Sequence, residues 1–357
     1  MAGFERLNIL TVTDNHRSRK WRCVITMTDR SMKGKRILIT GIAGFGGSWL
    51  AETILQNESD VEVFGIKRKT TSTLNIDHLA SNIRLFDADI VSYEAIDKAI
   101  SEINPHFVFH LAAVASSTKA KENPDITMKT NVEGTRNLLS AVAEHAGDIE
   151  FFHFASTSTV YRRAGTGKNT LISEDNPTEP TDPYSASKLE AEKLCDEFLL
   201  DAEIPVVVTR AFNQGGPRCR DDIVANKIAT LAADVKIKKL SSFAFGNVEA
   251  VRDFTDVRDI AFGYLAAAKK ARIGEVYNLC NGKGIRIRDM IDNALEYVGA
   301  KGEVKITVDE KLFRKGEPDV IVGDNTKAKK ELGWKPKIPF ERTLKDMIDY
   351  YLSAAQG

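Results

Sequence analysis

A glycine-rich turn between a short apolar strand and a helical segment constrains the fold of this chain more than any other feature. The run RILITGIAGFGGSWL, residues 36–50, places Gly41, Gly44 and Gly47 between these two elements. Glycines at these points let the backbone turn tightly, let a pyrophosphate approach it, and aim the N-terminus of the helix at negative charge. A second apolar strand is expected at residues 61–66. This strand, turn, helix and strand context predicts a dinucleotide-binding unit rather than a tight turn without a ligand.

Strand and helix patterns alternate with short connections along the first part of the chain. Strands are expected at 107–111, 150–155 and 206–210, and helices at 135–144 and 187–200. Such alternation predicts an α/β fold, a Rossmann-type doubly wound parallel sheet. Beyond Asn213 the pattern breaks into shorter pieces. We therefore predict an NADP-binding Rossmann domain at 32–212, with later segments folding back onto it, and mainly a smaller C-terminal substrate lobe at 213–357. Residues 1–31 are expected to be an N-terminal extension, either disordered or a short hairpin of 7–13 and 22–28.

Composition excludes several classes of protein. A chain of 357 residues with 43% hydrophobic and 28% charged residues is globular, and its formal net charge of zero gives no reason to expect nucleic acid. No apolar run approaches the ~18 residues that a membrane-spanning helix needs. Four cysteines, Cys23, Cys195, Cys219 and Cys280, and six histidines show no metal-binding spacing. We expect a reduced, cytoplasmic protein with no metal.

The segment YSASK, residues 184–188, is the strongest catalytic signal. A helix places Tyr184 and Lys188 one turn apart on the same face. A lysine ammonium near a phenol favours the phenolate, so the pKa of the tyrosine, normally near ~10, would fall towards the physiological range. The pair therefore predicts an acid/base tyrosine assisted by a lysine.

The end of the second strand bears on the choice of dinucleotide. An NAD site usually has an Asp or Glu there for the ribose hydroxyls, whereas a 2′-phosphate calls for cations. This chain has Lys67, Arg68 and Lys69 and no acid. Arg68 is the best candidate because its planar guanidinium matches a phosphate. NADP(H) is favoured, and NAD(H) is the alternative; the same residues could also form a solvated basic loop.

Together these motifs resemble the extended short-chain dehydrogenase/reductase family, in particular its nucleotide-sugar enzymes, from about Lys33 to the C-terminus. DADI at 87–90 resembles the family's adenine-contacting turn, and HLAA at 110–113 resembles the strand end beneath the cofactor. The stretch STSTVY at 156–161 resembles its serine/threonine strand end, which makes Thr157 the catalytic hydroxyl beside Tyr184 and Lys188. The resemblance and the charge argument give the cofactor contacts as Gly41, Gly44, Phe45, Gly47, Arg68, Lys69, Asp89, Ile90, Leu111, Ala112, Ala113, Tyr184 and Lys188.

Later segments are similar to the branch that acts on GDP-linked deoxyhexoses. RAFNQGGP at 210–217 resembles the substrate-gripping turn, which implies that Asn213 touches the sugar or its diphosphate. By the same resemblance Arg252 and Arg314 would clamp the diphosphate as charge-assisted donors. Ser158 is a further expected substrate contact. The substrate implied is a nucleotide-diphosphate sugar.

The family supports three outcomes: 4,6-dehydration, epimerisation and net reduction of a 4-keto sugar. Its dehydratases place acidic side chains just after the catalytic threonine, where this chain has Ser158 and Thr159, although Glu174 or another loop carboxylate could substitute. An epimerase typically retains NAD, which the basic residues 67–69 disfavour. We therefore predict an NADP-dependent reductase of a nucleotide-linked, GDP-type 4-keto-6-deoxyhexose, with dehydratase or epimerase chemistry as the alternative.

The sequence is also compatible with other functions. A non-catalytic NADP-binding regulatory protein would not need the Tyr/Lys pair and the placed hydroxyl, and a purely structural protein would not need a cofactor. The basic loop 162–168 could contact an unusual sugar or be solvated. The family's dimer contact uses the helices at 131–144 and 184–200, and apolar residues at i, i+3 and i+4 there favour a homodimer. The base, the exact sugar and any preceding epimerisation are not predicted.

Overall fold

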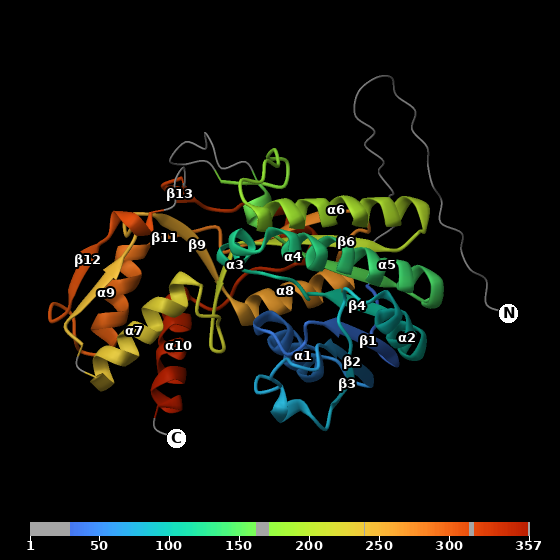
Figure 1. Cartoon of the computed structure of the whole chain (residues 1–357), viewed down its shortest axis with the longest axis horizontal. Helices are drawn as coiled ribbons and strands as arrows, with labels where there is room; N and C mark the ends of the chain where they lie inside the picture. Colours follow the sequence, from blue (N-terminus) through green and yellow to red (C-terminus); the bar gives the residue numbers. More distant parts are fainter. Residues whose placement is uncertain (1–28, 162–170, 239, 314–317, 356–357) are drawn as a thin grey trace.

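The structure, a computed structural model, describes residues 29–161, 171–238, 240–313 and 318–355. The expected hairpin of the N-terminal extension lies outside these residues. The described chain forms a large lobe built on a parallel sheet and a smaller lobe to one side of it (Figure 1). Two late elements, described below, also belong to the large lobe.

The large lobe contains a seven-stranded parallel sheet with the order β10-β6-β5-β4-β1-β2-β3. Its strands are β1 (Lys35–Thr40), β2 (Val61–Lys67), β3 (Ile83–Asp87), β4 (Phe107–His110), β5 (Phe151–Thr157), β6 (Val206–Ala211) and β10 (Val276–Leu279). The order reverses beside β1, which pairs in parallel register with β2 on one side and with β4 on the other. Such a reversal is the topological switch point of a Rossmann-type sheet, which confirms the predicted fold class.

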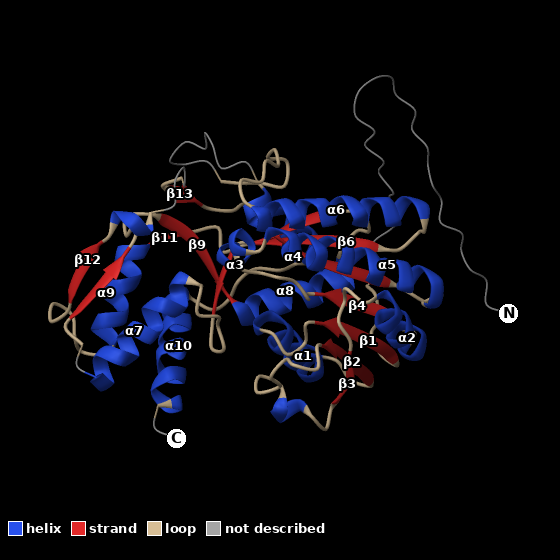
Figure 2. Cartoon of the chain, viewed as in Figure 1, coloured by secondary structure: helices blue, strands red, loops and turns tan. Residues whose placement is uncertain are grey.

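Helices cover both faces of this sheet (Figure 2). They are α1 (Phe45–Asn57), α2 (Tyr93–Ile103), α3 (Ser117–Glu122), α4 (Pro124–Met128), α5 (Gly134–His145), α6 (Pro183–Asp201) and α8 (Val257–Lys270), with a π-helical turn at Lys129–Glu133. Side chains alternate along each strand, so Ile37 and Ile39 pack in the core beneath α1 and α8, whereas Leu38 packs beneath α2, α5 and α6. Two separate apolar layers therefore hold the sheet.

Helix α6, which carries Tyr184 and Lys188, begins earlier than the sequence pattern suggested. Asp182 caps it by accepting a hydrogen bond from the backbone N–H of Ser185 at 3.1 Å, and Pro183 occupies the first helical position. Both residues favour a helix start because the cap satisfies an otherwise unpaired donor and proline already has a helical φ. Tyr184 therefore lies in the first turn and Lys188 in the second.

The smaller lobe packs three helices against short strands. It contains α7 (Val224–Lys238), α9 (Ile287–Tyr297), α10 (Phe340–Ala354), β7 (Asn213–Gly215), β8 (Ser242–Phe245), β9 (Val251–Asp256), β11 (Gly284–Arg286), β12 (Lys305–Val308) and β13 (Val320–Ile321). A third apolar cluster lies among its helices and β9. The later elements β10 and α8 return to the large lobe. In the described part of the chain, no helix is both long and apolar enough to cross a membrane.

Candidate active site

A cleft of about 490 Å³ opens at the carboxyl ends of the parallel strands, beside the switch point. Open α/β sheets bind ligands in this place. The loop after β1, the ends of β2, β4, β5 and β6, and the start of α6 form its walls, and residues of 213–223 close it from the side of the smaller lobe. Most of the predicted site residues line it: Gly41, Gly44, Phe45, Gly47, Arg68, Asp89, Ile90, Leu111, Ala112, Ala113, Thr157, Tyr184, Lys188 and Asn213.

The glycine turn brings the N-terminus of α1 to the floor of the cleft. Gly41 has φ +71°, and a Cβ there would lie 2.9 Å from the backbone of Ala112. At Gly47 a Cβ would lie 2.2 Å from the carbonyl oxygen of Gly41. Helix α1 has no side-chain cap at Gly44 and no acidic residue in its first turn. Its N-terminal N–H groups therefore lack side-chain acceptors, an arrangement that fits a dinucleotide's pyrophosphate.

The far end of the cleft carries the residues expected near the adenosine. Lys67 forms a 2.6 Å ion pair with Asp87, so its charge is already partnered. Arg68 lines the cleft together with Thr71, which the sequence reasoning missed. Lys69 is exposed and is not among the lining residues. Of the basic residues 67–69, Lys67 and Arg68 line the cleft and Lys69 does not.

A buried histidine supports the strand end beneath the expected nicotinamide position. His110 lies between two hydroxyls, with Nδ1 2.7 Å from Oγ1 of Thr40 and Nε2 2.9 Å from Oγ1 of Thr135. Thr135 donates its proton to the carbonyl oxygen of Asn131 at 2.6 Å, so Nε2 of His110 must donate to Thr135 and Nδ1 must accept from Thr40. Burial lowers the pKa of His110 to about 3, which keeps the ring neutral. This residue therefore positions the strand and carries no charge.

Tyr184, Thr157 and Lys188 meet at the centre of the cleft. The hydroxyl of Thr157 hydrogen-bonds to the phenol of Tyr184. Lys188 is buried, with Nζ 4.3 Å from the centroid of the Phe154 ring, and burial lowers its pKa to about 8. Thr157, Tyr184 and Lys188, which the sequence analysis grouped as a catalytic centre, thus all line the cleft.

The electrostatics of Tyr184 differ from the sequence-based expectation. Burial raises the pKa of Tyr184 above its ordinary value, while Arg220 and the hydrogen bond to Thr157 lower it. The main cation opposing the effect of burial is therefore Arg220, and not Lys188 as the YSASK spacing suggested. Arg220 is held in the cleft wall by a 2.7 Å hydrogen bond to the carbonyl oxygen of Ala115 and by Asp222. No sequence pattern marks Arg220, because it lies in an irregular loop.

The predicted substrate contacts are only partly gathered. Asn213 lines the cleft and donates to the carbonyl oxygen of Asp253 at 3.0 Å. Ser158 is not among the lining residues, whereas its neighbour Thr159 is. Arg252 is buried outside the lining and donates to the carbonyl oxygens of Val251 and Asp319. Arg314 and the basic loop 162–168 lie outside the described residues. The roles of Ser158, Arg252 and Arg314 therefore stay predictions.

Carboxylates are scarce around the reacting centre. Asp89 is the one Asp or Glu among the described residues that line the cleft, and it lies at the adenosine end with Ile90. Glu174, the expected substitute acid, accepts a 2.7 Å hydrogen bond from the backbone N–H of Asn278 and is not in the lining. Burial raises the pKa of Glu174. Its contact with Asn278 is a structural one.

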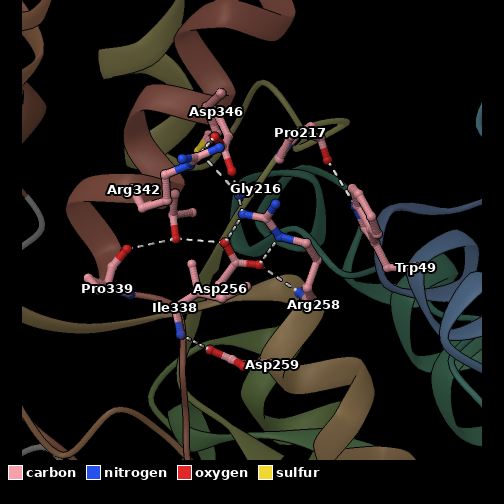
Figure 3. Close-up of polar contacts among 12 residues, drawn as sticks. Trp49, Gly216, Pro217, Asp256, Arg258, Asp259, Ile338, Pro339, Arg342 and Asp346 are labelled. Atoms are coloured by element: carbon pink, nitrogen blue, oxygen red, sulfur yellow. Dashed lines mark hydrogen bonds and ion pairs between the residues drawn. The ribbon is translucent and has the colours of Figure 1, made fainter. Parts of the chain in front are cut away.

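A network of charged side chains ties the two lobes together next to the cleft (Figure 3). Arg258, at the start of α8, bonds to the carboxylate of Asp256 at 2.6 and 2.8 Å and to Asp346 of α10 at 2.8 Å. Trp49 of α1 donates to the carbonyl oxygen of Pro217 at 3.1 Å, just after β7. Helix α1 and the smaller lobe are therefore joined to the start of α8 and to each other through partly buried polar contacts.

One group of possible metal ligands lies away from the cleft. Asp97, Glu144 and His145 could bring one ligand atom each within 4.8 Å of the others, a proximity that sequence spacing did not reveal. His145 and Asp97 already form a 2.6 Å ion pair, and Glu144 accepts a 2.8 Å hydrogen bond from Tyr93. The three side chains are therefore explained as part of a surface hydrogen-bond and ion-pair network between α2 and α5.

Comparison with known proteins agrees with this geometry. The family model described as GDP-mannose 4,6 dehydratase matches residues 38–347. The chain is 29% identical over 340 residues to the GDP-mannose 4,6 dehydratase of Homo sapiens, covering 87% of this chain and 90% of that protein. It is 27% identical over 318 residues to the GDP-6-deoxy-D-mannose reductase of Pseudomonas aeruginosa, covering 88% and 96%. The solved structure of RMD from Pseudomonas aeruginosa, complexed with NADPH, superimposes with a TM-score of 0.78 at 26% identity, covering 90% of this chain and 99% of that one.

The glycine turn, the switch-point cleft and the Thr/Tyr/Lys centre define an NAD(P)-dependent nucleotide-sugar enzyme of the extended short-chain dehydrogenase/reductase type. Within that class, the chain belongs to the GDP-mannose 4,6 dehydratase family. The resemblance drawn from the sequence is thereby confirmed.

Proposed function

We propose that this enzyme is an NADPH-dependent reductase of a nucleotide-linked 4-keto-6-deoxyhexose, with GDP as the favoured nucleotide. The observation that carries the proposal is the lack of a carboxylate at the reacting centre, within the described residues. Thr159 occupies the cleft wall where the family's dehydratases have an acid, and Asp89 is far along the cleft. Dehydration needs a group that takes the C5 proton and one that expels the C6 hydroxyl, and a threonine is a poor base for that step.

The proposed mechanism uses the three central side chains. When bound, the dinucleotide supplies the hydride to C4 of the sugar. Tyr184 donates its phenolic proton to the C4 carbonyl oxygen, and the hydroxyl of Thr157 hydrogen-bonds at the same oxygen. Lys188, buried beside them, holds the ribose and supplies positive charge below about pH 8. Asn213 is placed to orient the sugar from the other wall.

The preference for NADPH rests on Arg68. It lines the cleft at the end of β2, where an NAD enzyme usually has an acid, and its guanidinium can bind a 2′-phosphate with two hydrogen bonds. The Pseudomonas aeruginosa structure, which contains NADPH, supports this choice.

The second candidate is 4,6-dehydration with internal return of the hydride. The name of the matching family model and that of the human relative favour it. It would need a carboxylate that the described lining lacks near Tyr184.

One experiment separates the two functions. Purified full-length protein is incubated with NADPH, and separately with NADH, against GDP-mannose and its 4-keto-6-deoxy derivative. We expect stoichiometric oxidation of NADPH and a gain of two hydrogens in the mass of the keto sugar. Loss of water from GDP-mannose without net cofactor consumption would instead establish the dehydratase.

We also infer a homodimer in a reducing cytoplasm. Ile126 and Met128 of α4 and Leu200 of α6 are exposed apolar residues near the helices that the sequence analysis expected at the contact. Cys195, Cys219 and Cys280 are free and buried. Light scattering on the purified protein tests the dimer, and a monomeric mass would contradict it.

A further inference from the structure

A continuous chain of hydroxyl groups leads from the catalytic tyrosine to a carboxylate at the edge of the cleft. Oγ1 of Thr157, which bonds to Tyr184, lies 3.2 Å from Oγ1 of Thr159. Oγ1 of Thr159 lies 3.0 Å from Oγ of Ser185, and Oγ of Ser185 lies 2.8 Å from Oδ2 of Asp182. The three steps from Thr157 to Asp182 are each within hydrogen-bond reach. Three hydroxyls therefore connect the phenol to Asp182.

Proton counting gives this chain a direction. A hydroxyl has one proton to donate, and an ionised carboxylate can only accept. The hydroxyl of Ser185 can donate either to Oδ2 of Asp182 or to Oγ1 of Thr159, and either Thr157 or Thr159 can donate in the bond between them. With Asp182 protonated and Tyr184 ionised, Asp182 donates to Ser185, Ser185 donates to Thr159, Thr159 donates to Thr157, and Thr157 donates to the phenolate. The same atoms thus support both protonation states of the tyrosine.

We propose that Thr157, Thr159, Ser185 and Asp182 form a proton relay that reprotonates Tyr184 after each turnover. The inference rests on the proposed function, because net reduction consumes one proton per sugar and leaves the tyrosine ionised. An enzyme that returns the hydride and proton internally has no such need. Thr159 stands where the family's dehydratases have an acidic side chain. In the relay its hydroxyl passes a proton towards Tyr184, which only net reduction requires.

The relay step balances in protons. Tyr184 transfers its proton to the sugar oxygen, which has gained an electron pair from the arriving hydride. Asp182 takes a proton from water at the partly exposed start of α6 and gives it to Ser185. One O–H bond forms and one breaks at Ser185, Thr159 and Thr157 in turn, and the last proton restores the phenol. The net change is one proton moved from solvent to the product.

The helix cap and the relay use different oxygens of Asp182. Oδ1 accepts the backbone N–H of Ser185, whereas Oδ2 accepts its hydroxyl. Asparagine caps helices about as well as aspartate does, but its amide cannot carry an exchangeable acidic proton. Asp182→Asn therefore removes the acid while keeping the cap. Thr159→Val removes one hydroxyl at nearly constant shape.

The test is stopped-flow oxidation of NADPH by full-length protein with GDP-4-keto-6-deoxymannose. In both variants the first turnover uses a tyrosine that is already protonated, so we expect a rapid burst of one equivalent per active site. Steady-state turnover should then fall by roughly tenfold or more, with a larger solvent deuterium isotope effect and partial recovery on adding imidazole. Thr159→Ser should recover most of the rate that the valine variant loses.

The controls separate the relay from the proposed function. Thr230→Val, on α7 away from the cleft, should leave the rates unchanged. A slow first turnover without a burst would mean that the hydroxyls only position Tyr184, and wild-type steady-state rates in both variants would mean that water reprotonates it directly; either result overturns the relay alone. If the wild-type enzyme does not oxidise NADPH with this sugar, the proposed function fails, and the relay that serves it fails too.

Discussion

Arg210 and Glu192 form a buried ion pair with two hydrogen bonds, Nε to Oε1 at 3.1 Å and Nη2 to Oε2 at 2.6 Å. Glu192 also accepts a hydrogen bond from Ser156, the residue before Thr157 at the end of β5. The ion pair therefore joins β6 and the strand end of Thr157 to α6, the helix of Tyr184. Two of the three catalytic side chains keep their relative position through this contact.

We predict that Glu192→Ala lowers the free energy of unfolding by about 3–5 kcal/mol, because Arg210 would be left as an uncompensated buried charge. Urea denaturation measures the effect. Glu190→Ala is the matched control on the same helix; its carboxylate is exposed and pairs with Lys193 at 2.9 Å, so it should change stability by less than about 0.5 kcal/mol. Equal effects at the two positions would show that the buried pair contributes nothing special.

Tyr184→Phe should reduce kcat by at least about 100-fold while NADPH still binds, because the phenyl ring fills the same space but has no proton to give. Steady-state kinetics and quenching of nicotinamide fluorescence measure the two quantities. Tyr93→Phe, whose hydroxyl contacts Glu144 on the outer surface, is the control and should retain activity. Retained turnover in the Tyr184 variant would refute the assignment of the acid.

Arg68→Ala should weaken NADPH binding by about 10- to 100-fold and leave NADH binding almost unchanged, since it removes charge-assisted bonds to the 2′-phosphate alone. Lys69→Ala tests the neighbouring prediction. Because Lys69 is not in the cleft lining, its loss should cost much less. Titration calorimetry with both cofactors gives the four dissociation constants, and an equal loss of NADH affinity would argue against phosphate recognition by Arg68.

Gly47→Ala should destabilise the enzyme by about 1–3 kcal/mol and weaken cofactor binding, because its Cβ would lie 2.2 Å from the carbonyl oxygen of Gly41 and 2.8 Å from Cα of Ile42. Backbone atoms cannot move aside to relieve such a clash, whereas the end of a flexible side chain can. At Gly46 the nearest atom is a side-chain carbon of Leu111 at 3.4 Å, so Gly46→Ala should leave the free energy of unfolding unchanged or slightly higher. Thermal unfolding compares the two variants, and similar losses would contradict the packing argument.

The contribution of two buried histidines to stability should fall as pH drops below 6.5. Burial lowers the pKa of both His110 and His153 from 6.5 to about 3, so between these values the unfolded chain binds more protons than the folded one. The loss therefore begins near pH 6.5 and is complete near pH 3. His153→Gln should reduce the slope of unfolding free energy against pH by about one proton, and an unchanged slope would show that this histidine does not titrate on unfolding.

Local signals in the sequence were enough to predict the fold and to predict which central residues line the cleft. The glycine turn, the strand periods and the YSASK spacing each describe contacts between residues close in sequence, and Gly41, Gly47, Tyr184 and Lys188 lie in the cleft as expected. The sequence favoured Arg68 over Lys67 and Lys69 only by the shape of its guanidinium. Their difference depends on which side chain turns into the cleft and on the 2.6 Å pair that occupies Lys67.

Long-range contacts escaped prediction. Arg220 reaches Ala115, over a hundred residues earlier in the chain, through a loop with no period or motif. Glu174 was considered as an acid because of its position in the sequence, but folding places it against Asn278. The hydroxyl chain from Thr159 to Ser185 likewise depends on how β5 meets α6. Such contacts follow from tertiary packing, which no local pattern encodes.

The most direct test of the central claim is the fate of a labelled hydride. The enzyme is given GDP-4-keto-6-deoxymannose and NADPH that carries deuterium at the transferred position, and the sugar product is examined by mass spectrometry. Net reduction predicts one deuterium at C4 of the product for every NADPH oxidised, and formation of this labelled product at least about 100-fold more slowly by Tyr184→Phe. Recovery of the keto sugar without deuterium, with the labelled NADPH unoxidised, would contradict the reductase assignment.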